Sequence, residues 1–288
     1  MRWDVDLDTI REVVVARERA DLVGLGQTCA VLAGGTFLFS EPQLRLERLI
    51  DITGLGWPAL LETADGLEIA ATCTLAELAG ATRGREVGRA VLREDWPGTT
   101  LFAQGCRALL ASHKIWRSAT VGGNICLSLP AGGVLAALTA LDAVASIWSP
   151  DGTDRRIPLR DFVLGPESNV LAPGEILRSV HVPTRTLRAR TAFRKIALAP
   201  FGRSGAVVMG RREADDRTAI TITGSTTRPV VLDFPASPDP DRVAAAVAAL
   251  DPALWFDDPH GAPDWRRHVT GVLAREVADE LRTDGSGT

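Results

Sequence analysis

Short apolar runs separated by turn residues dominate the first part of the chain. Residues 7–19 have apolar positions spaced as in a helix, whereas residues 30–33 and 49–52 are short apolar runs typical of buried strands. A helix combined with two such strands makes a βαβ-like unit. The pattern therefore predicts a lobe of this kind that ends near residue 56.

Helix signals become more frequent in the middle of the chain. Residues 67–71 alternate like a strand, and Thr74 and Glu77 follow at the spacing of a capping box, which predicts a helix from Leu75. Asp151-Gly152 is a hairpin signal between two extended segments. The other expected elements are helices at 100–111 and 134–141, an irregular run at 112–118, and extended segments at 143–148, 156–159 and 176–182.

A change of pattern near Pro183 predicts a domain boundary. Four strand-like segments follow it, and then two helices, the first beginning at Pro240 with Asp239 as its cap. Strands followed by helices are typical of an α+β lobe. We therefore expect an α+β protein with a first domain at 1–183, divided into subdomains at about 1–56 and 57–183, and a second domain at 184–288. The elements expected in the second domain are strands at 191–198, 205–211, 218–223 and 230–234 and a last helix at 264–281, before a disordered end at 283–288.

Composition changes this picture little but excludes several functions. The chain has 288 residues, of which 45% are hydrophobic and 24% charged, as in ordinary soluble globular proteins. Lys and Arg number 32 against 36 Asp and Glu, so no basic surface for nucleic acid is expected. No apolar stretch reaches the roughly 18 residues of a membrane span, and the opening residues do not resemble a signal peptide. A cytoplasmic location is expected.

The cysteines and histidines do not suggest a metal or iron–sulfur site. The four cysteines are widely separated and form no Cys-x-x-Cys pair, so we expect small buried side chains. Cys126 is of most interest, because it follows closely after a glycine pair. The other cysteines are Cys29, Cys73 and Cys106, and the histidines expected to be structural are His113, His181 and His260.

Two Gly-Gly turns carry the candidate chemistry. They are Leu32-Ala33-Gly34-Gly35-Thr36 and Ala119-Thr120-Val121-Gly122-Gly123-Asn124. Each is apolar up to the glycine pair and polar after it, as when a buried strand delivers bare backbone N–H groups to an anion. Either turn alone is more often a plain tight turn. Together they predict a pyrophosphate that is held from both sides.

Further motifs follow the turns in a recognisable order. They are Ala70-Ala71-Thr72-Cys73-Thr74-Leu75-Ala76-Glu77-Leu78, Pro130-Ala131-Gly132, Leu171-Ala172-Pro173-Gly174-Glu175-Ile176-Leu177, Phe193-Arg194-Lys195 and Asp264-Trp265-Arg266-Arg267-His268. Over almost the whole chain, the sequence resembles the FAD-binding medium subunit of the molybdenum hydroxylase family, of the carbon monoxide dehydrogenase flavoprotein and xanthine dehydrogenase FAD-domain type. The resemblance implies a two-subdomain FAD-binding domain of the vanillyl-alcohol oxidase/PCMH type and a C-terminal lobe like that of carbon monoxide dehydrogenase flavoproteins.

The resemblance also implies which residues hold FAD. The two turns would form the two walls of the pyrophosphate site, and Leu171 would touch the flavin end. Lys195 would lie near the isoalloxazine, where a cation can stabilise the anionic reduced flavin; a solvated strand lysine is the alternative. Arg266, Arg267 and His268 are expected at the surface or in an interface. The implied cofactor-binding residues are Leu32, Ala33, Gly34, Gly35, Thr36, Phe37, Ala119, Thr120, Gly122, Gly123, Asn124, Leu171 and Lys195, with no catalytic or metal-binding side chain.

The sequence departs from the family pattern where polar residues are usual. Phe37 follows the first turn, and Leu127, Leu129 and then Gly133 follow the second. A less polar wall would make fewer hydrogen bonds to the cofactor, and Trp116, Leu127 and Leu129 would cover the flavin edge. A substitution confined to the core is the alternative.

The function implied by the resemblance is electron transfer. Electrons would pass from a molybdenum cofactor in a large partner subunit, through [2Fe-2S] clusters in a small one, to the FAD of this chain. They would leave to an acceptor such as NAD, quinone or oxygen. The alternatives are a stand-alone FAD-dependent oxidoreductase of a biosynthetic pathway and a scaffold subunit that has lost FAD.

Overall fold

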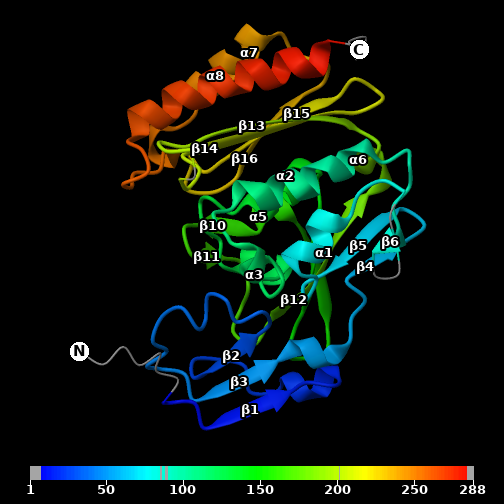
Figure 1. Ribbon diagram of the computed structural model, residues 1–288, viewed down its shortest axis with the longest axis vertical. Coiled ribbons are helices and arrows are strands. Elements are labelled where there is room, and N and C mark those ends of the chain that lie inside the picture. Colours follow the sequence, from blue (N-terminus) through cyan, green and yellow to red (C-terminus); the bar gives the residue numbers. More distant parts are fainter. Residues whose placement is uncertain (1–7, 85, 88–89, 201, 284–288) are drawn as a thin grey trace.

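Three sheets follow one another along the long axis of the molecule (Figure 1). The computed structural model describes residues 8–84, 86–87, 90–200 and 202–283. A three-stranded sheet lies at one end, a five-stranded sheet in the middle, and a four-stranded sheet lies beneath the last two helices. This mixture of helices with mostly antiparallel sheets confirms the predicted α+β class.

The N-terminal sheet is parallel, with β3 (Arg48–Asp51) between β1 (Glu12–Val15) and β2 (Cys29–Leu32). The two strands that the sequence predicted are therefore confirmed. The helix predicted at 7–19 is wrong over its described part, since residues 13–15 are three valines in a row. Their β-branched side chains favour a strand, and the backbone pairs with β3. Within the described part of 7–19, the one helical residue is Arg19, which begins the 3-10 turn η1 (Arg19–Leu22).

The central sheet has the strand order β4-β5-β12-β8-β9, with every neighbouring pair antiparallel. Asp151 and Gly152 turn the hairpin between β8 and β9 as predicted, with Gly152 at φ 86°. The sheet positions the segment after β5 and the loop before β12 beside each other. The strands are β4 (Leu60–Glu62), β5 (Gly66–Ala70), β8 (Val144–Trp148), β9 (Asp154–Pro158) and β12 (Ile176–Pro183).

Three main helices pack on the central sheet. The capping box that begins α1 (Leu75–Gly80) is confirmed, because Thr74 accepts from the Glu77 amide and the Glu77 carboxylate accepts from the Thr74 amide. Helix α2 (Thr100–Ala108) ends before the predicted residue 111, since Leu109 is already extended. Helix α5 (Gly133–Ala140) is buried along its whole length.

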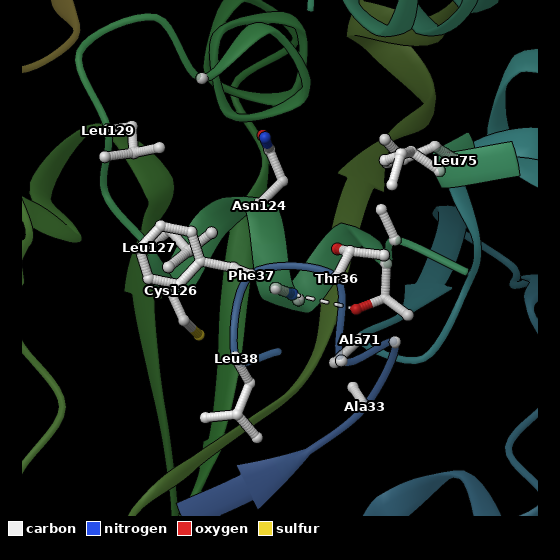
Figure 2. A pocket seen from close by; sticks show the side chains of 18 of the residues that line it. Ala33, Thr36, Phe37, Leu38, Ala71, Leu75, Asn124, Cys126, Leu127 and Leu129 are labelled. Atoms are coloured by element: carbon white, nitrogen blue, oxygen red, sulfur yellow. Dashed lines mark hydrogen bonds between the residues drawn. The ribbon is translucent and has the colours of Figure 1, made fainter. Parts of the chain in front are cut away.

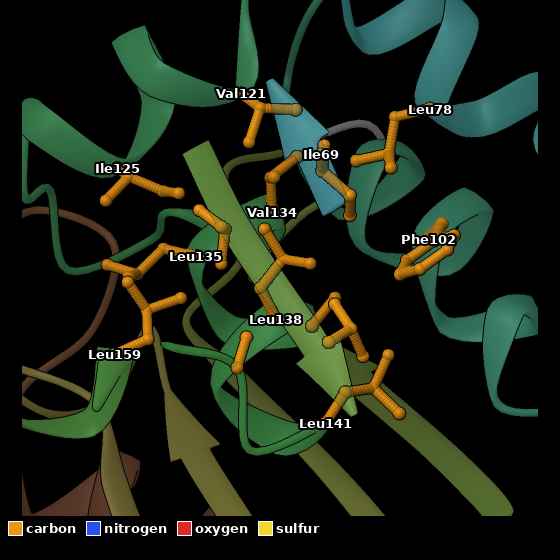
Figure 3. Packing of buried hydrophobic residues seen from close by; sticks show 14 of the residues in the cluster. Ile69, Leu78, Phe102, Val121, Ile125, Val134, Leu135, Leu138, Leu141 and Leu159 are labelled. Atoms are coloured by element: carbon orange, nitrogen blue, oxygen red, sulfur yellow. The ribbon is translucent and has the colours of Figure 1, made fainter. Parts of the chain in front are cut away.

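The main core lies between the central sheet and these helices. Figure 3 shows its centre, where Val134 and Leu138 of α5 lie among side chains of the sheet and of α2. The helices approach closely where Gly105 meets Gly133, since a Cβ on Gly133 would lie 2.3 Å from the Gly105 carbonyl oxygen. Gly133 is therefore a packing residue of the core rather than part of a ligand wall.

The C-terminal lobe is an antiparallel sheet covered by two helices, as predicted. The Asp239 side chain accepts from the Arg242 amide and so caps α7 (Pro240–Ala248), which packs beside α8 (Pro263–Arg282). Within the described ranges, no helix has the length and apolar character needed to cross a membrane. Residues 284–288 of the expected disordered end lie outside the described residues. The strands are β13 (Arg190–Ile196), β14 (Ala206–Arg212), β15 (Thr218–Thr223) and β16 (Val230–Phe234).

Arg266 was expected at the surface or in an interface, and this expectation is wrong. Its side chain is 1% exposed, and its guanidinium donates to the carbonyls of Gly205, Gly224 and Gly261 and pairs with Asp258. Arg266 therefore fastens α8 to the sheet beneath it.

Short elements complete the fold. They are η2 (Ile52–Leu55), β6 (Glu86–Val87), β7 (Ala90–Val91), η3 (Pro97–Thr99), α3 (His113–Trp116), α4 (Val121–Cys126), η4 (Leu159–Asp161), β10 (Val163–Gly165), β11 (Ser168–Asn169), α6 (Thr184–Leu187) and η5 (Pro252–Leu254).

Candidate functional site

A cavity of about 750 Å³ lies between the N-terminal and central lobes (Figure 2). Its walls come from residues 31–38 at the end of β2 and beyond it, residues 119–132 in and around α4, and residues 108–115 from the end of α2 into α3. This volume falls in the range of about 300–1,000 Å³ typical of ligand sites. Every residue that the sequence comparison assigned to the cofactor lines this cavity, except Lys195.

The first glycine turn presents unpaired amides. Among the described residues, no acceptor lies within hydrogen-bonding range of the backbone N–H groups of residues 34–38. The loop is held from behind, because a Cβ on Gly34 would lie 1.8 Å from the Ser118 carbonyl oxygen. Gly35 has φ 66°, a conformation that L side chains rarely adopt. The predicted bare amides are therefore confirmed at this turn.

The second glycine turn differs from the prediction, because it opens helix α4 and its amides are already paired. The Val121 and Gly122 amides donate to the carbonyls of Cys73 and Ala71, each at 2.8 Å. The Gly123 amide donates to the Thr120 hydroxyl at 3.1 Å (Figure 2). The Asn124 amide donates to the Thr120 carbonyl. Bare amides on this side were a wrong expectation.

Side chains rather than amides provide the polar groups of the second wall. The Asn124 side-chain oxygen accepts from the Leu135 amide at 3.1 Å, which points the side chain toward the start of α5 (Figure 2). Among the described residues its NH₂ group has no acceptor, and the Thr120 hydroxyl hydrogen has none either. Thr120 and Asn124 line the same cavity as the first loop.

One region of the cavity is apolar where the family pattern expects polar residues. Phe37, Cys126, Leu127 and Leu129 lie close together there (Figure 2). Trp116 lies outside the lining and packs at the edge of the main core. The apolar wall thus comes from Phe37 and the two leucines.

The loop before β12 closes another part of the cavity, and sequence reasoning missed the residue that orders it. Asn169 accepts from the Leu171 amide at 3.0 Å and donates to the Cys126 carbonyl at 2.8 Å. Nearby, Arg155 donates twice to Glu175, which holds the pKa of that carboxyl at about 2. Leu171 is therefore fixed by a side chain that sequence patterns did not single out.

Comparison with known protein families identifies the family of this chain. The family model described as "FAD binding domain in molybdopterin dehydrogenase" matches residues 8–185, more than half of the chain. The chain belongs to this family. It is a flavoprotein oxidoreductase of the molybdenum hydroxylase family, and its cofactor is FAD.

Two curated relatives extend the similarity over both lobes. The carbon monoxide dehydrogenase medium chain of Afipia carboxidovorans is 24% identical over 96% of this chain and 96% of its own length. The 6-hydroxypseudooxynicotine dehydrogenase complex subunit alpha of Paenarthrobacter nicotinovorans is 24% identical over 88% of this chain and 86% of its own.

Solved structures share the fold. A Cu,Mo-CO dehydrogenase chain in its cyanide-inactivated form superposes with a TM-score of 0.78 at 21% identity, covering 94% of this chain and 96% of the other. A chain of quinoline 2-oxidoreductase from Pseudomonas putida 86 gives a TM-score of 0.73 at 16% identity with the same coverage. At these identities the structures establish the fold alone.

The chemistry of the cavity fits FAD. Consecutive unpaired amides form a concave donor set suited to the two phosphates, and the apolar wall suits the ring systems. Burial raises the pKa of the Cys126 thiol to about 12, which favours the neutral thiol. No group of His, Cys, Asp and Glu within the described residues could hold a metal.

Lys195 lies outside the cavity lining. It is an exposed residue of β13 whose ammonium donates to the Arg107 carbonyl at 3.4 Å. The C-terminal lobe instead sends Arg203 into the lining. Arg203 lies in a loop without a recognised motif, so sequence patterns did not single it out.

Proposed function

We infer that this chain is the FAD-binding electron-transfer subunit of a molybdenum hydroxylase. The observation that carries the proposal is the row of unpaired amides at residues 34–38, which faces a cofactor-sized cavity inside a fold of the matching family. The proposal includes the division into an FAD-binding domain at 1–183 and a C-terminal domain at 184–288.

FAD, when bound, supplies the redox chemistry, because it can accept two electrons. In our proposal, the amides of residues 34–38 bind the pyrophosphate from one side, and the Thr120 hydroxyl and Asn124 amide group donate from the other. Phe37, Leu127 and Leu129 exclude water from part of the cofactor. Where water is excluded, the local dielectric constant falls, so each remaining hydrogen bond to the cofactor becomes stronger.

The partners are proposed from the relatives. One relative is named a medium chain, one a complex subunit, and a third the FAD-subunit of nicotinate dehydrogenase from Eubacterium barkeri. We therefore propose a heterotrimer with a large molybdenum-cofactor subunit and a small [2Fe-2S] subunit. Electrons would reach FAD from the clusters and leave to an external acceptor such as NAD, quinone or oxygen.

Purification from the native host tests this proposal. We expect the chain to copurify with two other subunits, to be yellow, and to release FAD on denaturation. Molybdenum and iron should be found in the complex and be absent from the isolated chain. A lone chain that oxidises substrate or NAD(P)H unaided would contradict the subunit role, and a colourless chain without FAD would contradict the cofactor role.

A further inference from the structure

We propose that Arg203 is the cation that stabilises the reduced, anionic isoalloxazine of FAD in this protein. The inference rests on the proposed function and assigns a role that sequence resemblance gave to Lys195. Arg203 lines the cavity, whereas Lys195 lies outside its lining.

Arg203 provides the uncompensated positive charge among the described residues that line the cavity. Among the described lining residues only Glu175 and Arg203 carry a charge. Glu175 is neutralised by Arg155, whose guanidinium lies 2.6 Å and 2.8 Å from its two oxygens. The electrostatic field of Glu175 in the cavity is therefore largely cancelled, and that of Arg203 remains.

Arg203 is only weakly held by the protein itself. Within the described part of the chain, its guanidinium makes no hydrogen bond, and its one ion-pair partner is Asp258 at 4.0 Å. Asp258 is already bound to the buried Arg266 and to the His260 amide. The exposed Asp257 also interacts electrostatically with Arg266. The guanidinium of Arg203 thus keeps donors available for a ligand.

The location of Arg203 favours a ring rather than the phosphates. Its neighbour Ser204 donates to the Ala108 carbonyl at 3.0 Å, which ties this loop of the C-terminal lobe to the end of α2. The unpaired amides come from the opposite lobe, after β2 (Figure 1). Because Arg203 and the amides line one cavity from different lobes, a pyrophosphate bound at the amides would leave Arg203 to one of the two ring systems of FAD. Adenine stays neutral during turnover, whereas the reduced isoalloxazine carries a negative charge that a cation stabilises.

The FAD midpoint potential tests the proposal. In the full chain with its copurifying subunits, Arg203→Gln should weaken binding of reduced FAD roughly tenfold more than binding of oxidised FAD, the scale of one charge acting over several ångströms in a partly buried site. For a two-electron couple, that ratio lowers the potential by about 30 mV. Arg203→Lys keeps the charge and should restore most of the potential.

Two further variants serve as comparisons. Arg275→Gln removes a charge from α8, where Arg275 pairs with the exposed Asp241, and should leave the potential unchanged. Lys195→Gln tests the competing assignment and should also leave it unchanged. An unchanged potential in Arg203→Gln, or a shift in Lys195→Gln alone, would overturn the proposal.

The FAD content and affinity separate the remaining outcomes. If Arg203→Gln weakens oxidised and reduced FAD equally, Arg203 contacts a phosphate and the proposal is wrong. If the wild-type chain binds no FAD, the proposed function fails together with the inference. If FAD is bound normally and only the potential is insensitive to Arg203, the inference fails and the proposed function stands.

Discussion

At the scale of single residues, hydrogen bonding of the backbone distinguishes the two glycine pairs. Gly34 and Gly35 belong to a loop whose amides lack acceptors, whereas the amides of Gly122 and Gly123 are bound to Ala71 and Thr120. An unpaired amide in a concave loop is a stronger anion site than one that must first break a hydrogen bond. We therefore expect the first loop to contribute most of the binding to phosphate.

Replacing Gly34 tests this assignment. Gly34→Ala should displace the loop, because its Cβ would overlap the Ser118 carbonyl oxygen, and backbone cannot yield cheaply. We expect a loss of about 1–3 kcal/mol in the free energy of unfolding and a large loss of FAD affinity, measured by denaturant titration and by fluorescence of released flavin.

Gly26→Ala is the matched control for this substitution. Gly26 is an exposed residue of the same lobe, and no atom lies within 4 Å of a Cβ built there. The free energy of unfolding of Gly26→Ala should stay within about 0.5 kcal/mol of wild type, and the variant should keep its full FAD content. Equal FAD affinity in wild type and Gly34→Ala would show that the pyrophosphate is held elsewhere.

At the scale of elements, helix α5 connects the lobes. It is buried along its whole length, and it lies between the central lobe and the C-terminal sheet. Its first residue, Gly133, lets the α2 backbone approach closely, and the amide of Leu135 is capped by Asn124 from the cavity wall. Packing of α5 thus sets the position of one cavity donor.

Gly133→Ala should destabilise the protein without a direct effect on the cavity. The added methyl would meet the Gly105 carbonyl oxygen, so we expect a loss of about 1–3 kcal/mol in a thermal or denaturant melt. Gly80→Ala, in a helix with no atom within 4 Å of the new Cβ, should be neutral or gain up to about 1 kcal/mol. A Gly133→Ala protein as stable as wild type would mean that α2 and α5 separate without cost.

At the scale of the whole molecule, an ionic cluster joins the central and C-terminal lobes. Asp142, just after α5, pairs with Arg160 and Arg185, and Arg185 also pairs with Glu213 of the C-terminal lobe. Burial opposes ionisation of Asp142, but Arg211, Arg185 and Arg160 together lower its pKa below the usual value. The cluster therefore stabilises the ionised form of this carboxyl.

Asp142→Asn should reduce the dependence of stability on pH. Because the pKa of Asp142 is lower in the folded chain, its carboxylate adds stability above the ordinary pKa of 3.8, and this contribution is lost as the pH falls below that value. The variant should lose about 1–3 kcal/mol at neutral pH, and its melts should change less between pH 5 and strong acid.

Asp241→Asn provides the comparison for this measurement. Asp241 forms an exposed pair with Arg275, so its removal should change stability by no more than about 0.5 kcal/mol and leave the acid dependence as in wild type. Identical pH profiles for wild type and Asp142→Asn would exclude Asp142 from the link between the lobes.

The sequence by itself determined the elements whose causes are local. The capping box before Leu75, the buried apolar run of α5 and the Pro240 helix with its Asp239 cap each depend on neighbours within a few residues, so periodicity and spacing were enough. The same holds for the order of strands and helices in the C-terminal lobe. The helix expected at 7–19 failed because apolar spacing outweighed the strand preference of three consecutive valines.

Only the tertiary structure decided which groups in the site are available. The amides of Val121 and Gly122 are paired by carbonyls of Cys73 and Ala71, some fifty residues earlier in the chain. Arg203 reaches the cavity because a loop of the C-terminal lobe packs against α2. The buried Arg266 donates hydrogen bonds to three backbone carbonyls from separate segments. Such partners come together only when distant segments pack, so no local pattern specifies them.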